Sequence, residues 1–207
     1  SITNAGVFPV IGNSLFGLYS FRSAGLDPTN GDPQGYLNGN VSKDYTAILT
    51  NTPMSELVYH GSSRPNIFGS LRNNFSYKGI ALSFNITYKL NYYFRRKSIN
   101  LNYQLLLASQ HTDYNLRWQN VGDEQNTTVP SLVYTTNTNR NLFYNSSDVL
   151  VEKGDHIRLQ DISLSYDLKR SILKSSPFKS LQLYSYINNV GILWRANKSG
   201  IDPDYND

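Results

Sequence analysis

The stretch Ile80–Leu90 reads I-A-L-S-F-N-I-T-Y-K-L, and it decides the fold class. Apolar and other residues alternate along it without a break, and successive side chains of a β-strand point to opposite faces. The stretch therefore predicts a strand with one apolar face and one mostly polar face. At ~3.3 Å per residue it spans about 36 Å, which fits a tilted transmembrane strand of about 9–11 residues. A long strand of a soluble β-sandwich would show the same pattern, and this segment alone leaves both open.

The composition excludes a helical membrane protein. No apolar run in the 207 residues approaches the ~20 residues that a transmembrane helix needs. A mean hydropathy of −0.43 remains compatible with a β-barrel, because only alternate residues of a barrel strand face lipid. The chain has no Cys, so it can form neither a disulfide nor a thiolate metal site.

The charge pattern and the start of the chain give two further expectations. The net charge is +4, and the only cluster, Arg95–Lys97, favours the edge of a solvated or interfacial loop over a nucleic-acid patch. Ser1–Ser20 has no basic start and no continuous apolar core, so a signal peptide is not expected there. Either a mature protein begins here or the chain is a piece of something longer.

Four more segments are predicted to be strands, and the connections between strands alternate in length. The strands are Ser14–Ala24, Ile67–Lys78, His156–Leu168 and Leu181–Leu193. Lys78-Gly79 is a candidate two-residue hairpin turn, because glycine adopts the positive φ that such turns require.

The long connections are Gly25–Asn66 and Asn91–Asp155, and the pattern of Asn100–Gln110 within the second allows a short helix. The shorter connections are Gly79 and Lys169–Ser180. Short turns on one side and long loops on the other are typical of outer-membrane barrels. We therefore expect an all-β, antiparallel transmembrane barrel segment of about five strands with long external loops. Five strands cannot close a barrel, so further strands must come from outside this sequence.

Four blocks of sequence resemble the C-terminal third of SusC/RagA-type TonB-dependent transporters, in the order of that family. Gly12–Pro33 resembles its G-x-S-x-F-x-Y-x-x-x-G-L-D-P-x-x-G-x-P pattern, and Arg64–Gly79 its P-x-x-x-G-x-x-N-x-F-x-Y-K-G hairpin. Arg117–Pro130 resembles the R-W-x-x-P-G-D-x-x-x-x-x-x-P loop. Val151–Leu168 followed by Leu181–Trp194 resembles the F-V-x-x-G-x-Y-L-R-L-x-x-I-x-L-G-Y-x-L strand pair, and G-I-D-P at Gly200–Pro203 resembles the segment just before the family's last strand, which is not expected within these residues. Single departures occur at Val121, His156 and Ser165, and they touch no known chemical role.

The resemblance implies an outer-membrane barrel of about 22 strands that is closed by a plug. Such proteins import glycans or peptides with energy from TonB, beneath a SusD-like surface lipoprotein. Residues 1–207 would supply barrel wall and external loops. The partners would be the rest of the barrel and plug, the SusD-like protein, outer-membrane lipid and, through an N-terminal region that nothing here matches, TonB. No cofactor and no nucleic acid are expected.

Two sets of residues follow from the alternation. The lipid-facing candidates are apolar, namely Ile80, Leu82, Phe84, Ile86, Leu90, Ile162 and Leu164. The lumen-facing candidates, which can line a substrate path, are Arg72, Asn74, Ser83, Asn85, Thr87 and Lys89. Four tyrosines near the strand ends suit interfacial aromatic girdles, namely Tyr77, Tyr88, Tyr92 and Tyr93.

Two loop sites have a functional interpretation and a simpler structural one. Arg117 and Trp118 present an aromatic face beside polar groups, which suits stacking on a sugar or an aromatic side chain, but Trp118 can equally pack its loop. Asp27, Asn30 and Asp32 supply oxygens suited to Ca²⁺, but a type I turn explains the same residues and no metal is assigned.

No catalytic arrangement is visible in the sequence. The three histidines are scattered, and no Ser/His/Asp order, paired carboxylates or phosphate loop occurs. The expected function is import of a polar nutrient across the bacterial outer membrane, without enzymatic chemistry. The alternative is a stand-alone β-rich surface module, either carbohydrate-binding or adhesive.

Overall fold

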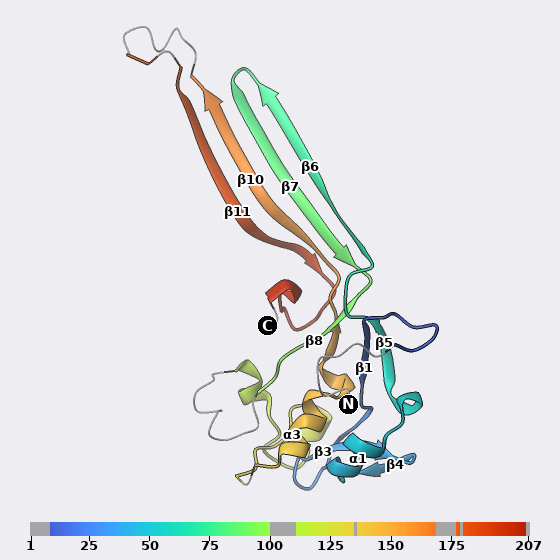
Figure 1. Ribbon diagram of the computed structural model, residues 1–207. Helices are drawn as coiled ribbons and strands as arrows, with labels where there is room; N and C mark the ends of the chain where they lie inside the picture. The colour runs from blue at the N-terminus through green and yellow to red at the C-terminus, as the bar shows by residue number, and fades with distance from the viewer. Residues whose placement is uncertain (1–8, 100–110, 135, 169–176, 179, 206–207) are drawn as a thin grey trace. The chain divides into compact units, whose positions relative to one another are not determined.

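The computed structural model describes residues 9–99, 111–134, 136–168, 177–178 and 180–205 (Figure 1). The chain divides into two compact units. The mixed unit comprises Ser1–Ser63 and Tyr93–Glu152, and the sheet unit comprises Arg64–Tyr92 and Lys153–Tyr205. The short helix expected within Asn100–Gln110 lies outside the described residues. Within the described ranges, no helix is long and apolar enough to cross a membrane.

The sheet unit is one antiparallel sheet of four long strands in the order β11-β10-β7-β6 (Figure 1). Its strands are β6 (Ile67–Tyr77), β7 (Ile80–Leu90), β10 (His156–Asp167) and β11 (Gln182–Arg195). Four of the five predicted strands are confirmed, and β7 begins and ends where the alternation does. A short 3₁₀ helix, η5 (Pro203–Tyr205), follows β11.

The hairpin between β6 and β7 is also confirmed. Tyr77 pairs with Ile80, which leaves Lys78 and Gly79 as the turn, with φ values of 48° and 89°. Two positive φ values in a two-residue turn define the type I′ hairpin, whose twist matches that of the strands. A Cβ at Gly79 would also lie 2.9 Å from the Asp167 carbonyl oxygen, so both conformation and space require glycine.

The register separates the two faces of this sheet. On one face Leu82 lies opposite Phe75 and Leu164. On the other face Asn85 lies opposite Arg72 and Asp161. The separation is weaker at the sheet's edges, where the apolar face includes Asn73 and Ser185 and the polar face includes Phe68, Tyr184, Tyr186 and Ile192.

A β-bulge keeps the polar residues of β10 on one face. Arg158 pairs with Thr87 and Asp161 pairs with Asn85, so Gln160 is an extra residue in β10. Polar positions are even-numbered before the bulge and odd-numbered after it. If β10 were regular through Gln160, Asp161 would point to the opposite face from Arg158, because the two residues are three positions apart and the side-chain period of a strand is two.

The prediction of one strand over Ser14–Ala24 in the long sheet is wrong. This segment forms β1 (Gly17–Ser20) and β2 (Ser23–Leu26), which belong to two small sheets of the mixed unit. The chain breaks between them because Phe21 exchanges backbone hydrogen bonds with the Ser146 carbonyl and the Asp148 amide, both 3.0 Å. The long sheet therefore has four described strands rather than about five.

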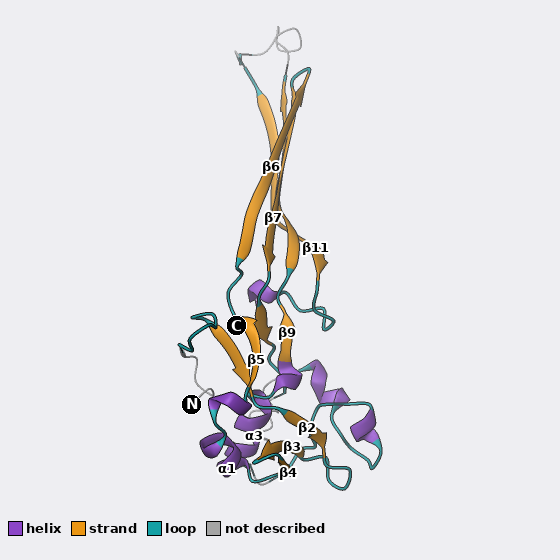
Figure 2. Ribbon diagram, turned by 90° about the vertical axis from the view of Figure 1, so that its right-hand side faces the viewer, coloured by secondary structure: helices purple, strands orange, loops and turns teal. Residues whose placement is uncertain are grey.

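The two long connections, expected as loops, fold into most of the mixed unit (Figure 2). β1 pairs with β5, β2 with β3 and β4, and β8 with β9, whose last residue belongs to the sheet unit. The bounds are β3 (Pro33–Leu37), β4 (Asn40–Ser42), α1 (Tyr45–Asn51), η1 (Met54–Glu56), β5 (Val58–Ser62), β8 (Tyr93–Arg95), η2 (Thr112–Leu116), η3 (Asp123–Gln125), α3 (Thr138–Asn145), η4 (Asp148–Leu150) and β9 (Val151–Lys153).

Two small cores hold this unit together. Tyr19, Phe21, Tyr45, Ile48 and Phe143 form one, which joins β1 to helices α1 and α3. The other consists of Ile99, Val129, Tyr144 and Leu150. Both helices have side-chain caps, because Asp44 accepts from the Ala47 amide and Asn137 from the Arg140 amide.

Candidate functional site

A charged cluster lies in the middle of the polar face of the sheet unit. Arg72 Nη2 lies 2.9 Å from Asp161 Oδ2, and Asn85 Nδ2 donates to the same oxygen at 3.3 Å. The second guanidinium nitrogen of Arg72 reaches Ser83 Oγ at 3.5 Å. Asp161 is only 3% exposed, so its charge is compensated by these partners rather than by water. The cluster thus joins three strands through side chains on one face.

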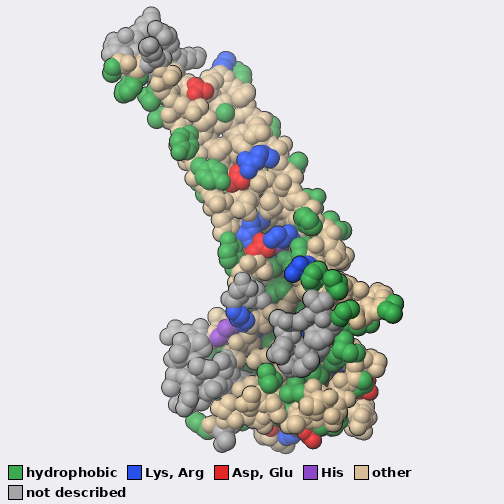
Figure 3. All heavy atoms as spheres, in the orientation of Figure 1, with side chains coloured by type: hydrophobic (Ala, Val, Ile, Leu, Met, Phe, Trp, Pro, Cys, Tyr) green, Lys and Arg blue, Asp and Glu red, His purple; other side chains and the backbone are tan. Residues whose placement is uncertain are grey.

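A second charged cluster lies where the same face meets the segment after β11. Arg158, 4% exposed, donates to Asn189 Oδ1 at 2.6 Å and to Asp202 Oδ1 at 2.6 Å. The same nitrogen, Nη2, also lies within bonding distance of the other Asp202 oxygen, so one end of the guanidinium is shared between the two carboxylate oxygens while Nη1 donates to Asn189. Figure 3 shows such blue and red groups side by side on the visible face of the sheet.

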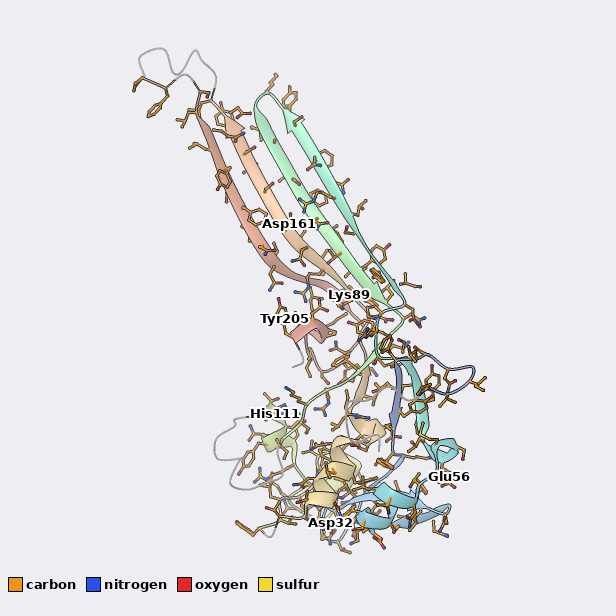
Figure 4. All side chains as sticks on the ribbon, viewed as in Figure 1. Asp32, Glu56, Lys89, His111, Asp161 and Tyr205 are labelled. Atoms are coloured by element: carbon orange, nitrogen blue, oxygen red, sulfur yellow. The ribbon has the colours of Figure 1, made fainter. Side chains whose placement is uncertain are left out.

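Asp204 extends this second cluster. Its carboxylate accepts from Lys89 Nζ at 2.7 Å and lies 3.3 Å from His156 Nε2 and 3.6 Å from Arg158. Burial opposes its ionisation, but the Lys89 hydrogen bond and the neighbouring positive charges outweigh burial and lower the pKa of Asp204. Lys89 and Tyr205 are labelled on either side of this cluster in Figure 4.

The sequence position of Tyr92 predicts that it belongs to an exposed aromatic girdle, but the structure buries its side chain. It is 6% exposed, its hydroxyl lies 3.2 Å from His156 Nδ1, and burial raises its pKa. A Cβ at Gly154 would lie 2.3 Å from the Tyr92 ring, so the glycine admits the ring. Tyr92 is therefore a packing residue of the sheet unit.

The lipid-facing candidates all lie on the apolar face. Leu82 and Leu164 are exposed, as is the neighbouring Phe75. Phe75 stacks on Phe84 with ring centroids 6.0 Å apart. The other candidates on this face are Ile80, which is exposed, and Ile86, Leu90 and Ile162, which are partly buried. These side chains form an outward apolar surface rather than a packed core.

The oxygen-rich loop at Asp27–Asp32 is held by cations of the protein itself. Asp27 Oδ2 lies 2.6 Å from Lys43 Nζ, and this hydrogen bond holds the Asp27 pKa well below its usual range. Asp32 Oδ1 accepts from Arg140 Nε at 2.7 Å, and Asn30 accepts from the Asp32 amide. The described residues contain no group of three or more His, Asp or Glu that could hold a metal ion.

Trp118 packs against this loop. A Cβ at Gly31, whose φ is 69°, would lie 2.4 Å from the indole ring, and the Ser131 amide donates to the Gly31 carbonyl at 3.0 Å. Trp118 Nε1 donates to Glu124, while Arg117 stacks on Tyr114 with 4.0 Å from guanidinium carbon to ring centroid. Two of the blocks that carry the family resemblance thus lie in contact.

The basic cluster Arg95–Lys97 is largely engaged within the mixed unit. Arg95 Nη2 donates to the Tyr19 carbonyl at 2.7 Å, and Arg96 pairs with Asp113 at 2.5 Å. A Ser20–His60 contact of 2.6 Å was not expected from sequence, but Ser20 is fully buried and cannot reach a substrate. Burial lowers the pKa of His60.

Sequence reasoning did not single out Asp161, Arg158, Asp202 and Asp204 as members of a site. For Asp161 a signal was present, since it alternates with Ile162 and shares the parity of Ser163 and Ser165. Arg158 lies on the other side of the bulge, so simple alternation assigns it to the wrong face. Asp202 and Asp204 follow the last strand, and nothing local indicates where they return.

Comparison with known proteins supports the fold. No family model matches the chain, and no curated protein matches it. Among solved structures it matches chains of the RagAB peptide transporter (TM-score 0.60, 19% identity) and of the RagAB peptide importer in the open-open and closed-closed states (TM-score 0.58, 18% identity for each). Each match covers 90% of this chain, which spans 19–20% of the matched chains. The chain therefore has the fold of part of a RagAB transporter structure.

Proposed function

We propose that this chain is the C-terminal part of a SusC/RagA-type, TonB-dependent importer in the bacterial outer membrane. The sheet unit forms a piece of barrel wall, with its apolar face toward lipid and its polar face toward the lumen. The mixed unit lies on the external side and helps to enclose the solute. The solute is a polar nutrient such as an oligosaccharide or a peptide.

One observation carries this proposal. Four strands of 11 to 14 residues share a register that keeps aliphatic and aromatic side chains outward on one face and charged clusters on the other. A water-soluble sheet would cover such an apolar face with a second layer. At ~3.3 Å per residue and ~45° tilt, an 11-residue strand spans about 26 Å in height, close to the ~25 Å apolar band of outer-membrane barrels.

The partners follow from the same proposal. The remaining strands and the plug complete the barrel, a SusD-like lipoprotein covers it, and TonB acts through another region of the protein. The matched structures are of the RagAB peptide importer, and a RagB-like lid partner is proposed for this chain on that basis.

Cysteine labelling on whole cells tests the topology. The chain has no Cys, so a single Val121→Cys in the mixed unit of the full-length protein gives a unique thiol at an exposed position within this region. We expect an impermeant maleimide to label it on intact cells. Lys78→Cys in the β6–β7 turn should react only after permeabilisation.

Reversed labelling would reverse the topology. Equal labelling of both positions in a soluble fraction, with a protein of 23.5 kDa detected by antibody, would instead support the stand-alone surface module. A band several times heavier in outer-membrane fractions would support the importer.

A further inference from the structure

A groove of about 440 Å³ lies within the mixed unit. It borders the end of β1, the β3–β4 hairpin and the segment that joins α1 to η1. Its lining residues are Phe21, Arg22, Tyr36, Asn38, Gly39, Thr52, Ser55 and Glu56. Ligand pockets have volumes of about 300–1,000 Å³, so this groove is large enough for a small ligand, such as a peptide or a sugar of a few units.

The groove carries two opposite charges that are not paired with each other. Arg22 and Glu56 are both exposed, and neither has an ion-pair partner within 4.0 Å among the described residues. The acidic groups Asp27 and Asp32 nearby in sequence are both paired with cations. Figure 4 labels Glu56 on η1, next to α1.

The rest of the lining positions these charges. The Arg22 guanidinium lies over the Tyr36 ring, 5.0 Å from its centroid, which restrains an otherwise mobile side chain. Asn38 and Gly39 form the turn of the β3–β4 hairpin with φ values of 50° and 78°, and nothing lies within 4 Å of a Cβ built on Gly39. Thr52 Oγ1 has no hydrogen-bond partner in the part of the chain that the structure describes.

We propose that this groove binds a short peptide by its two ends, with Arg22 receiving the carboxylate and Glu56 the amino group. A peptide with free ends carries both charges at neutral pH. A neutral oligosaccharide could contact the Tyr36 ring and the Asn38 side-chain amide, but it would leave Arg22 and Glu56 without a counter-charge. The inference rests on the proposed import function, because it names the substrate class.

Calorimetric titration of the full-length protein with tri-, tetra- and penta-alanine tests this inference. Each peptide is used with free ends, with an acetylated amino end and with an amidated carboxyl end. We expect either cap to weaken binding about tenfold, the usual loss when a hydrogen bond to a charged group is removed.

Two substitutions should act on opposite ends of the ligand. Arg22→Gln should weaken the free peptide about tenfold and make amidation harmless, and Glu56→Gln should do the same for acetylation. Lys153→Gln, which removes an exposed charge outside the groove, is the matched control and should leave every affinity unchanged.

Equal affinities for free and capped peptides would overturn the inference. It would also be overturned if amidation weakened binding to Arg22→Gln as much as to Glu56→Gln, or if acetylation did so. If peptides enter cells through the outer-membrane protein while both variants behave as wild type, the groove is refuted and import stands. If the capped peptides and the two variants behave as expected but the protein is soluble and of 23.5 kDa, peptide binding in the groove is supported and the import proposal fails.

Discussion

Placing arginine at Phe84 is the sharpest test of which face of the sheet meets lipid. Phe84 is next to Asn85, the central residue of β7 between Ile80 and Leu90. A one-residue offset at ~45° tilt is only about 2 Å in height, so Phe84 lies near the middle of the proposed bilayer. Arginine on the lipid face costs about 2–4 kcal/mol at the midplane, and this position should lie in the upper half of that range.

The loss of the aromatic ring must be separated from the added charge. Phe84 stacks on Phe75, and such a pair contributes about 0.5–1.5 kcal/mol. Phe84→Leu loses the stacking but stays apolar, so the difference between Phe84→Arg and Phe84→Leu isolates the charge. Ser83→Arg, one residue away on the polar face, should cost less than about 1 kcal/mol even beside Arg72, since exposed like charges repel weakly.

The assay is the free energy of unfolding of the full-length protein from lipid bilayers, measured by guanidinium titration. We expect Phe84→Arg to be less stable than Ser83→Arg by at least ~2 kcal/mol. Equal costs at the two positions would refute a lipid-facing side. A larger cost at Ser83 would mean that the faces are reversed.

Two further predictions concern packing and charge. Gly31→Ala should destabilise the mixed unit more than Gly39→Ala, because both positions have positive φ but only Gly31 has Trp118 where the Cβ would lie, and thermal unfolding of the two variants measures the difference; equal losses would show that only φ matters. The lowered pKa of Asp204 means that the folded state binds fewer protons than the unfolded state near that pKa, so its stabilisation is present above about pH 4 and lost as pH falls through the folded-state pKa. Asp204→Asn should remove this part of the acid sensitivity in unfolding titrations, and an unchanged pH profile would contradict the assignment.

The long sheet was largely predictable because its signals are local. β7 follows directly from unbroken alternation, and the turn at Lys78-Gly79 follows from the need for positive φ. The polar set on β6 and β7 was predicted on a single face, and the register places it there. Even the bulge at Gln160 leaves a trace, since polar residues change parity between Arg158 and Asp161.

The mixed unit was not predictable in the same way because its pairings are distant in sequence. β1 pairs with β5, which begins at Val58, and Phe21 bonds to backbone groups near Ser146. These contacts interrupt a segment whose aromatic pattern alone favours one long strand. A short element that takes its stability from remote partners shows little periodicity of its own.

The polar face divides into paired and unpaired groups, and this division bears on the proposed import function. Arg72, Asn85 and Lys89 are engaged with Asp161 or Asp204. Separating such a pair leaves a polar or charged group without its partner, which costs free energy. In the proposed importer, a solute would therefore not readily replace Asp161 or Asp204 as the hydrogen-bond partner of these side chains. Asn74 and Thr87 share this face and have no side-chain hydrogen bond among the described residues. In the proposed importer, these two of the six lumen candidates are therefore best suited to contact a moving solute, while the charged residues join the strands.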